Sequence, residues 1–522
     1  MLKKLHGRKL AVCLIGGAMY ALFSAFGWQA EHGGVIWAGG ALLVAALLVW
    51  PIAALLAVLL ERGYTRALRR EKTFRAGRAF AFILACYVPM FCVAFPGSFA
   101  YDVPYQLRQV VTGAYSTHHP LLHTLALGGL LQLGRALGDI NLGAALYTAL
   151  QMALLAGCFA LTCGSIARQS GARAAKRAAV FFALYPLNMV MAVNATKDVL
   201  FGGFFALTLA LLNEIQEKPS RGLALKIAVC GALAVMLRNN MAYAALVWLA
   251  ILTIGLRKGE KSAALAMLLA LAVGLCGNAA LKHATRAESG DMSEMLSWPI
   301  QQLARARLYD EERLTDAEKE AIDELMPGEA WACYDPTISD PVKFEFDTQA
   351  FRADVKKYVG VWLSVGKKCA GTYLDATMAL TYPFFYPYRE YRVSGYYVQM
   401  GMSDAYDAGW CDFDPPESRS LFPRALASLS WRFGAKGAMQ IPVVGWLFNM
   451  GVIVWTMLFF ALREMYWGRW RRFGTALLPV LLWGTFLLGP VMAGRYIYPF
   501  VCALPVLAAR PGRSVKEAAR HG

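Results

Sequence analysis

Two acidic residues stand in short polar segments between long apolar runs. Asp102 follows a Pro-Gly break at the end of one run, and Asp198 follows Lys197 in the segment 194–198 between two others. A carboxylate at a half-dry membrane interface can have a raised pKa and act as a general base, so Asp102 is our first candidate catalytic residue. Asp198 is the second candidate, because it places another carboxylate at the same depth as Asp102. The alternative for Asp102 is helix capping, and for the Lys-Asp pair a plain helix end.

Three of the seven histidines lie within one short segment: His118, His119 and His123. His119 and His123 have the i, i+4 spacing that places two metal ligands on one helix face, whereas His118 points elsewhere. We favour substrate hydrogen bonding over metal binding for them, and expect no cofactor other than a divalent cation at most. Tyr105 and Gln106, a little upstream, are further candidates for substrate binding.

Three cations lie at the ends of other apolar runs: Lys197, Arg238 and Arg495. Each alone could be a snorkelling anchor. Arg forms bidentate bonds to phosphate and Lys supplies a point charge, so together they could neutralise one phosphate at the head-group level. Tyr496, next to Arg495, joins them as a candidate substrate-binding residue. A lipid phosphate is the expected ligand.

Long apolar runs must position these side chains. The chain has 522 residues, of which 57% are hydrophobic and 17% are charged, a composition typical of a polytopic membrane protein. A bilayer core about 30 Å thick needs about 20 apolar residues per helix, so we expect an all-α protein with about twelve transmembrane helices. The spans are expected near residues 10–28, 35–60, 79–95, 141–163, 178–193, 199–213, 223–237, 241–256, 262–280, 441–461, 473–490 and 496–509.

Lys and Arg set the expected orientation, since short loops rich in them stay on the cytoplasmic side. The basic segment 61–78 and the basic C-terminal tail then lie inside, and both termini are cytoplasmic in a multi-pass plasma-membrane protein. All the candidate residues fall on the extracytoplasmic face. Residues 121–137 are expected to form a juxtamembrane helix there, because one more crossing would reverse the sidedness. The net charge of +17 reflects this bias and attraction to anionic membrane lipids, with no need for nucleic acid.

The chain divides into four expected regions. These are two extra N-terminal transmembrane helices (1–78), a transmembrane module with the candidate residues (79–280), a mostly helical extracytoplasmic domain (281–440), and the C-terminal transmembrane helices with a basic tail (441–522). The third region has a capping box at Thr315 and Glu318, which indicates a helix start. It also holds Cys333, Cys369 and Cys411, any two of which could form a disulfide outside the cytoplasm.

In chain order, Asp102 lies in the first large outer loop, His119-Pro120-Leu121 follows it, and Asp198 lies in the next outer loop. This layout, over residues 79–509, resembles the GT-C class of polyprenyl-phosphate-sugar glycosyltransferases, which includes protein O-mannosyltransferases and the lipid A aminoarabinose transferase. The strings at 95–97, 118–120 and 197–201 also look like an uncharacterised bacterial membrane family assigned to that superfamily. Unlike many members, this chain has two earlier spans and a single acid in the first loop.

This resemblance implies an inverting glycosyltransferase whose donor is a polyprenyl-phosphate-linked sugar. The acceptor would be a glycan, lipid or protein of the cell envelope. Asp102 would be the general base, and the three cations would stabilise the leaving phosphate. Asp198 and the histidines would position sugar or acceptor, or Asp198 could share the base role or hold a divalent ion. Two other classes stay open: a lipid-linked sugar flippase or transporter, and an oligosaccharide polymerase or ligase that works through outer Arg and His residues. The spans carry almost no charge, which is unlike most transporters.

Overall fold

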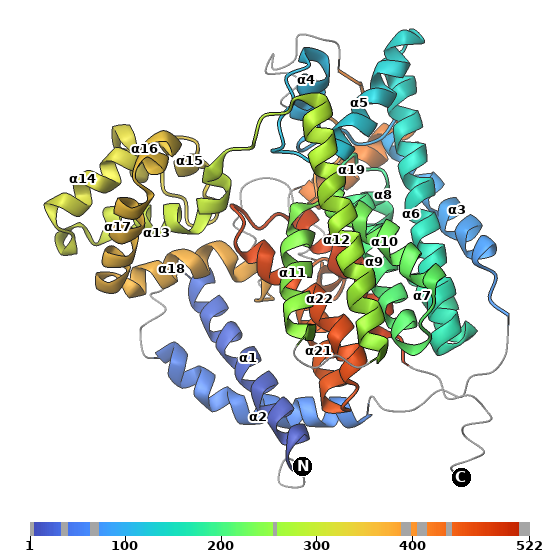
Figure 1. The fold of residues 1–522 in the computed structure, drawn as a ribbon, viewed down its shortest axis with the longest axis horizontal. Coiled ribbons are helices and arrows are strands. Elements are labelled where there is room, and N and C mark those ends of the chain that lie inside the picture. The colour runs from blue at the N-terminus through green and yellow to red at the C-terminus, as the bar shows by residue number, and fades with distance from the viewer. Residues whose placement is uncertain are drawn as a thin grey trace.

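The fold is a helical bundle with a smaller helical unit at its side and a helix hairpin below it (Figure 1). The computed structural model describes residues 5–32, 40–62, 73–253, 258–387, 398–403, 415–434 and 441–510. Within these ranges the chain forms helices and no strand. The prediction of an all-α protein is therefore confirmed for the described part of the chain.

The bundle is built around one central helix, α9 (Lys197–Glu217). Its sequence is apolar on all sides, as expected of a helix buried within a bundle, and nearly every one of its residues is buried. Helices α6, α10, α12, α22 and α23 all contact it. The other bundle helices are α3 (Ala76–Ala94), α6 (Ile140–Ser170), α7 (Ala172–Leu184), α8 (Pro186–Ala192), α10 (Arg221–Leu237), α11 (Asn239–Thr253), α12 (Lys258–Thr285), α21 (Met450–Tyr466), α22 (Trp470–Leu487) and α23 (Tyr498–Ala508).

The first two helices, α1 (Arg8–Glu31) and α2 (Gly40–Arg62), form the hairpin at the lower left of Figure 1. They pack closely because α1 has a glycine at the contact. A Cβ atom on Gly17 would lie 2.7 Å from the carbonyl oxygen of Val49 and 2.9 Å from Cβ of Ala53. Small residues at such contacts are typical of helices that pack within membranes. Helix α1 also contacts α21 and α18 (Ala370–Thr381), which ties the hairpin to the rest of the molecule.

Short helices close the upper end of the bundle in Figure 1. Helix α4 (Val103–Thr112) packs on α5 (Leu121–Ala136), and α5 packs on α6. The predicted helix at 121–137 is therefore present. Helix α19 (Pro423–Gly434) contacts α3, and two 3-10 helices, η6 (Val444–Leu447) and η7 (Gly494–Ile497), precede α21 and α23.

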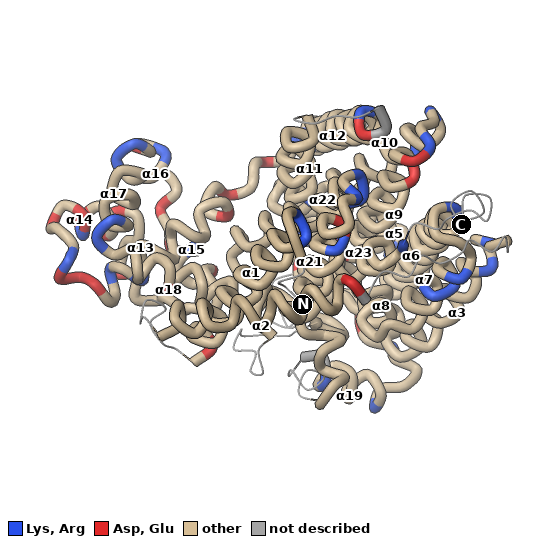
Figure 2. The backbone as a smooth tube through the Cα atoms, turned by 90° about the horizontal axis from the view of Figure 1, so that it is seen from below, with Lys and Arg blue, Asp and Glu red and all other residues tan. Residues whose placement is uncertain are grey.

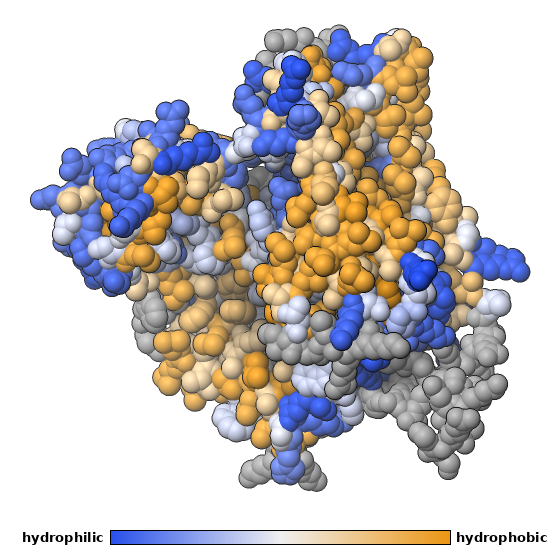
Figure 3. All heavy atoms as spheres, viewed as in Figure 1, coloured by the Kyte–Doolittle hydropathy of each residue, from blue (hydrophilic) through white to orange (hydrophobic). Residues whose placement is uncertain are grey.

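The side unit, which comprises α13 to α17, has a hydrophobic cluster separate from the bundle core, which extends from Ile300 to Tyr373 at the start of α18. Its capping box at Thr315 and Glu318 is confirmed. In Figure 3 the surface of the side unit is largely hydrophilic, whereas the surface of the bundle that faces the viewer is mostly hydrophobic. The helices are α13 (Ser297–Tyr309), α14 (Asp316–Leu325), α15 (Asp340–Lys343), α16 (Thr348–Ala353) and α17 (Val355–Lys368), with 3-10 helices η2 (Met292–Leu296), η3 (Glu311–Arg313) and η4 (Pro327–Cys333), and η5 (Tyr382–Phe384) after α18.

The segment 281–440 is shared between the side unit and the bundle. Phe384, Phe385 and Met400 belong to the bundle core, and the indole Nε1 of Trp455 donates a hydrogen bond of 2.6 Å to the carbonyl oxygen of Phe385. Of its three cysteines, Cys333 and Cys369 are unpaired thiols, and Cys411 lies outside the described residues.

The structure supports fewer spans than predicted. By length and composition, six of the described helices could cross a membrane: α1, α2, α3, α6, α9 and α12. Two shorter apolar helices cover 239–253 and 494–508. The apolar run at 178–193 is not one helix, because the residue before a proline is forced out of the helical region and the chain breaks at Tyr185 into α7 and α8. The helix predicted at 441–461 begins only at Met450.

Candidate functional site

Charged residues from four separate segments meet at one end of the bundle. Asp102 directly precedes α4, Lys197 and Asp198 begin α9, Arg238 ends α10, and Arg495 lies in η7. All five are linked by ion pairs, and we call them the charged cluster. The sequence predicted these residues as candidates on one face, and the fold brings all five together.

Asp102 is held by two cations. The guanidinium of Arg495 forms a bidentate contact, with Nη1 3.1 Å from Oδ2 and Nη2 3.1 Å from Oδ1. The ammonium of Lys197 donates to Oδ2 at 3.0 Å. Charge-assisted bonds of this kind are the strong ones among protein hydrogen bonds. The Asp102 side chain makes no capping bond to α4, and 22% of it stays exposed.

These contacts overturn the prediction of a raised pKa for Asp102. Burial alone would raise the pKa of this carboxyl, but Arg495 and Lys197 together hold it well below its usual range. Asp102 is therefore ionised at neutral pH and is a weak base while both cations contact it. Asp102 can act as a general base only after Arg495 and Lys197 have paired with another anion in its place.

Asp198 is the most buried member of the charged cluster, with none of its side chain exposed. It is ion-paired with Arg238, and Nε of Arg495 lies 3.7 Å from its Oδ2. The hydroxyl of Thr196 donates to the same oxygen at 3.3 Å. Removing one partner from a buried ion pair costs about 3–5 kcal/mol. Asp198 is thus placed to hold the two arginines and not to contact a substrate directly.

Aromatic rings support both arginines. The ring of Tyr496 lies between them, 4.6 Å from the guanidinium carbon of Arg238 and 5.4 Å from that of Arg495. Arg238 also lies 4.4 Å from the ring centre of Phe486, and Arg495 lies 4.6 Å from that of Tyr101. These ring contacts add cation–π attraction to the ion pairs of both arginines.

Tyr101 and Phe486 were not predicted as site residues. Tyr101 has a positive φ of 55°, which is uncommon for a residue other than glycine and is found most often at functional sites. Gln399 holds it there, because its backbone N–H donates to the Tyr101 hydroxyl and its side-chain oxygen accepts from the Tyr101 backbone N–H. Tyr101 adjoins Asp102 in the sequence, which was a usable signal. Gln399 and Phe486 gave none.

His119 adjoins the cluster, and its Nδ1 lies 3.7 Å from Oδ2 of Asp102 and 3.5 Å from Nζ of Lys197. Burial lowers the pKa of His119 to about 3, so the imidazole is neutral. His118 stays exposed and its Nδ1 lies 3.9 Å from Oε1 of Glu294, on η2. Tyr105 is also exposed, with its ring centre 6.4 Å from that of His119.

His123 and Gln106 are not placed to bind a substrate. Both are buried, and they form a hydrogen-bonded chain with Tyr147 and Gln151. The Tyr147 hydroxyl donates to Gln151, so it accepts from Nε2–H of His123, whose Nδ1 accepts from the Gln106 amide at 3.0 Å. This chain locks α4, α5 and α6 together. His119 precedes α5 and does not share a face with His123, and no group of three or more potential metal ligands occurs in the described ranges.

The charged cluster has a surplus of positive charge. Three cations face two carboxylates, and the adjoining imidazole is neutral. Partly buried cations attract anions strongly, because the surroundings screen charge less than water does. Lys197 and Arg495 keep 15% and 10% of their side chains exposed. The arrangement can therefore receive one more anion, and the geometry of Arg495 suits two oxygens of a carboxylate or phosphate.

These features define an all-α protein with membrane-length apolar helices and an anion-attracting charged cluster at one end of its bundle. The chain belongs to DUF6020, a family of unknown function, whose sequence profile matches residues 111–521. Lys197, Asp198, Arg238 and Arg495 lie in the matched region, and Asp102 precedes it. No curated protein and no solved structure matches the chain.

Proposed function

We propose that this protein is an inverting glycosyltransferase of the GT-C type, which moves a sugar from a polyprenyl phosphate to an acceptor of the cell envelope. The observation that carries the proposal is the charged cluster, where one accessible carboxylate contacts two cations and the whole has a surplus positive charge. A phosphate and a general base are the two partners that such a transfer needs. The donor tail would lie along the apolar helices, with the cluster on the extracytoplasmic face of the plasma membrane.

Donor binding would change the state of Asp102. The donor phosphate would compete with this carboxylate for Arg495 and Lys197, both of which keep exposed surface. Burial already acts to raise the pKa of Asp102, and only the cations oppose it. Once the phosphate occupies those cations, the pKa of the carboxyl rises and Asp102 becomes an effective base. The cluster would thus create its base only when the donor is bound.

The transfer step would then proceed in line. The acceptor hydroxyl oxygen attacks the anomeric carbon, and the bond from that carbon to the phosphate oxygen breaks. The hydroxyl proton passes to Asp102, and the electron pair of the broken bond stays on the polyprenyl phosphate. Arg495 and Lys197 stabilise the charge that grows on this leaving group, and Asp198 and Arg238 hold Arg495 in place. His118, His119 and Tyr105 lie at the edge where sugar or acceptor would enter.

Replacing Asp102 by Asn tests the proposal. We expect Asp102→Asn to abolish transfer from undecaprenyl-phosphate-linked hexoses to the envelope fraction of cells that lack the protein. Binding of undecaprenyl phosphate, measured by native mass spectrometry on the full-length protein, should be retained or strengthened, because the competing carboxylate is gone. Full transfer activity in this variant would contradict the proposal that Asp102 is the general base of a glycosyltransferase.

The phosphate clamp is tested with the cations. Arg495→Gln should weaken undecaprenyl phosphate binding by about tenfold, as expected for the loss of one charge-assisted contact. Arg108, an exposed arginine on α4 outside the cluster, supplies the matched control Arg108→Gln. Unchanged affinity in both Arg495→Gln and Lys197→Ala would remove the clamp.

The ion pairs of Asp102 also favour a second candidate, an oligosaccharide polymerase or ligase that uses arginine and histidine without an acidic base. In that enzyme Asp102 would only order Arg495. Asp102→Asn would then keep transfer activity while Arg495→Gln would lose it, so the activity of Asp102→Asn distinguishes the two candidates.

A further inference from the structure

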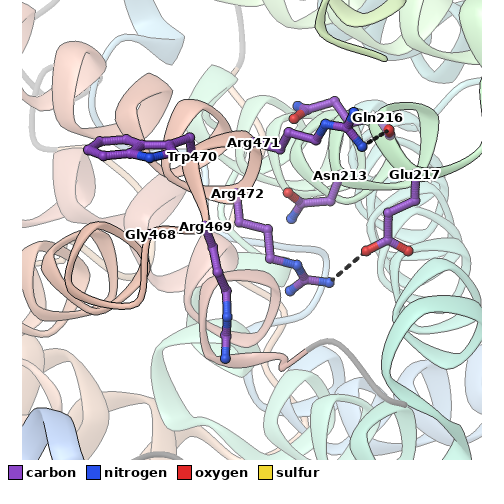
Figure 4. Close-up of a pocket in the computed structure, with 8 residues that line it drawn as sticks. All are labelled: Asn213, Gln216, Glu217, Gly468, Arg469, Trp470, Arg471 and Arg472. Atoms are coloured by element: carbon purple, nitrogen blue, oxygen red, sulfur yellow. Dashed lines mark hydrogen bonds and ion pairs between the residues drawn. The ribbon is translucent and has the colours of Figure 1, made fainter. Parts of the chain in front are cut away.

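A second polar site lies at the other end of α9. A cavity of about 270 Å³ opens between the last turns of this helix and the start of α22 (Figure 4). Its lining residues are Asn213, Gln216, Glu217, Gly468, Arg469, Trp470, Arg471 and Arg472. In the view from below, Lys and Arg segments gather beside α21, α22 and α23 (Figure 2).

The length of α9 sets the depth of this pocket. The helix has 21 residues, so at 1.5 Å per residue its ends are about 30 Å apart. That is about the thickness of the hydrocarbon core of a bilayer. The charged cluster at the start of α9 and the pocket at its end therefore lie at the levels of opposite head groups.

The pocket attracts anions. Arg472 forms an ion pair with Glu217, and Arg469 forms one with Glu464, each with a nitrogen–oxygen distance of 3.4 Å. Arg471 donates only to the carbonyl oxygen of Gln216, at 3.4 Å, and forms no ion pair with a carboxylate of the described chain. Glu464 also pairs with Arg463 at 2.6 Å, so four arginines face two carboxylates. The N-terminus of α22 adds its positive dipole end to this surplus.

The pocket also offers hydrogen-bond acceptors that lack donors. Asn213 and Gln216 are 6% and 4% exposed, and neither side-chain oxygen has a hydrogen-bond partner in the part of the chain that the structure describes. The Gln216 amide nitrogen donates to Oγ1 of Thr475 at 3.0 Å, and its side-chain oxygen is the group without a partner. Figure 4 shows both side chains reaching from α9 toward the arginines of α22. Buried acceptors of this kind need a donor, which water or a ligand hydroxyl supplies.

We propose that this pocket binds a phosphate ester that carries free hydroxyl groups, with the head group of phosphatidylglycerol as its membrane source. The phosphate would contact Arg471 and the start of α22, and the glycerol hydroxyls would donate to Asn213 and Gln216. Trp470 is exposed, as suits a residue in the interfacial belt beside a bound lipid. A phosphate without hydroxyls leaves both acceptors unsatisfied, and choline supplies no donor. A soluble glycerol phosphate has the same recognition chemistry.

Native mass spectrometry of the full-length protein in detergent tests this site. The probes are short-chain phosphatidylglycerol, phosphatidic acid, phosphatidylcholine and sn-glycerol 3-phosphate, each added alone. We expect phosphatidylglycerol to bind more tightly than phosphatidic acid, and both more tightly than phosphatidylcholine. Binding confined to the lipid identifies the membrane as the source, and equal binding of sn-glycerol 3-phosphate identifies a soluble ester; either outcome supports the site.

Two variants and one control decide the outcome. Arg471→Gln should lower the affinity for phosphatidylglycerol by about tenfold. Asn213→Leu should reduce that affinity to the level of phosphatidic acid, since only the hydroxyl contact is lost. Arg173, an exposed arginine at the start of α7, gives the control Arg173→Gln, which should bind as the wild type does. Equal binding of phosphatidylcholine and phosphatidylglycerol, or equal losses in Arg471→Gln and Arg173→Gln, would overturn the proposal.

Discussion

The reactivity of a single carboxylate depends on its partners. Asp102 has the exposure expected of a catalytic base, yet Arg495 and Lys197 keep it ionised and weakly basic. A glutamine or asparagine in its place would free both cations. The same residue can therefore be an ion-pair partner in the resting protein and a base in the loaded one, and the charge of the ligand decides which.

Sequence reasoning found the residue types of the cluster and missed their pairing. Asp102 and Arg495 are far apart in the chain, and no spacing rule connects them. The i, i+4 argument for His119 and His123 was wrong for a local reason: Pro120 is the N-cap of α5, so His119 stands outside the helix. Both ring nitrogens of His123 are occupied by Gln106 and Tyr147, so the predicted contact of His123 with a substrate would require that one of these hydrogen bonds breaks.

Acid should weaken the fold through its buried histidines. Burial lowers the pKa of both His119 and His123 to about 3, against 6.5 for a free histidine. Below pH 6.5 these histidines bind protons in the unfolded chain but stay neutral in the folded chain. The stability that the neutral histidines contribute is therefore fully present above pH 6.5 and is lost as the pH falls toward about 3. We expect the thermal midpoint, followed by intrinsic fluorescence in detergent, to fall over this range.

His123→Gln should make that fall smaller, since glutamine does not titrate. Exposed His283 gives the matched control His283→Gln, which should keep the wild-type dependence on pH. An identical pH dependence in His123→Gln and the wild type would show that this buried ring contributes no linkage.

At the scale of elements, apolar runs located the helices and local chemistry decided where they end. The run at 178–193 had the length of one span, but Pro186 divides it into α7 and α8. The apolar residues before Met450 form η6 and a turn with a positive φ of 65° at Val443, and α21 starts after them. Hydropathy measures how apolar a stretch is, and it does not report where the backbone leaves the helical conformation.

Two glycines meet at the contact between α5 and α6, Gly134 on α5 and Gly143 on α6. A Cβ atom on Gly143 would collide with the backbone carbonyl of Leu130 and come within 2.9 Å of Cα of Leu131. Backbone atoms cannot turn aside as a flexible side chain can. We expect Gly143→Ala to push α5 away from α6 and to destabilise the protein by about 1–3 kcal/mol. It should also lower transfer activity, because the chain from Gln106 to Gln151 crosses this contact.

Gly129 on α5 is the control for this substitution. A Cβ atom there would meet nothing within 4 Å, so Gly129→Ala should be neutral or stabilise the helix by up to about 1 kcal/mol. Both variants are measured by chemical unfolding in the same detergent. Equal stability of the two would mean that the helices can move apart without cost.

At the scale of the molecule, α9 connects two polar sites through an apolar bundle. Its first turn carries Lys197 and Asp198, and its last turn carries Gln216 and Glu217. The side unit joins the end that holds the charged cluster, since Ile338 bridges to Val491 and the indole of Trp298 donates to the carbonyl oxygen of Leu487. With α9 as a membrane span, we expect the side unit and the arginine pocket to lie on opposite faces of a membrane.

Thiol labelling from one side tests that arrangement. Cys333 is exposed on the side unit, and Lys218 is exposed in the turn after α9, so Cys333 alone and Lys218→Cys alone, each in a chain without other cysteines, report on the two faces. The arginine-rich end should face the cytoplasm, because positively charged loops are retained there. A membrane-impermeant maleimide should therefore label Cys333 in intact cells, and should label the cysteine at 218 only after permeabilisation. Labelling of both from the same side would contradict the assignment of α9 as a span, and labelling in the reverse order would place the charged cluster inside the cell.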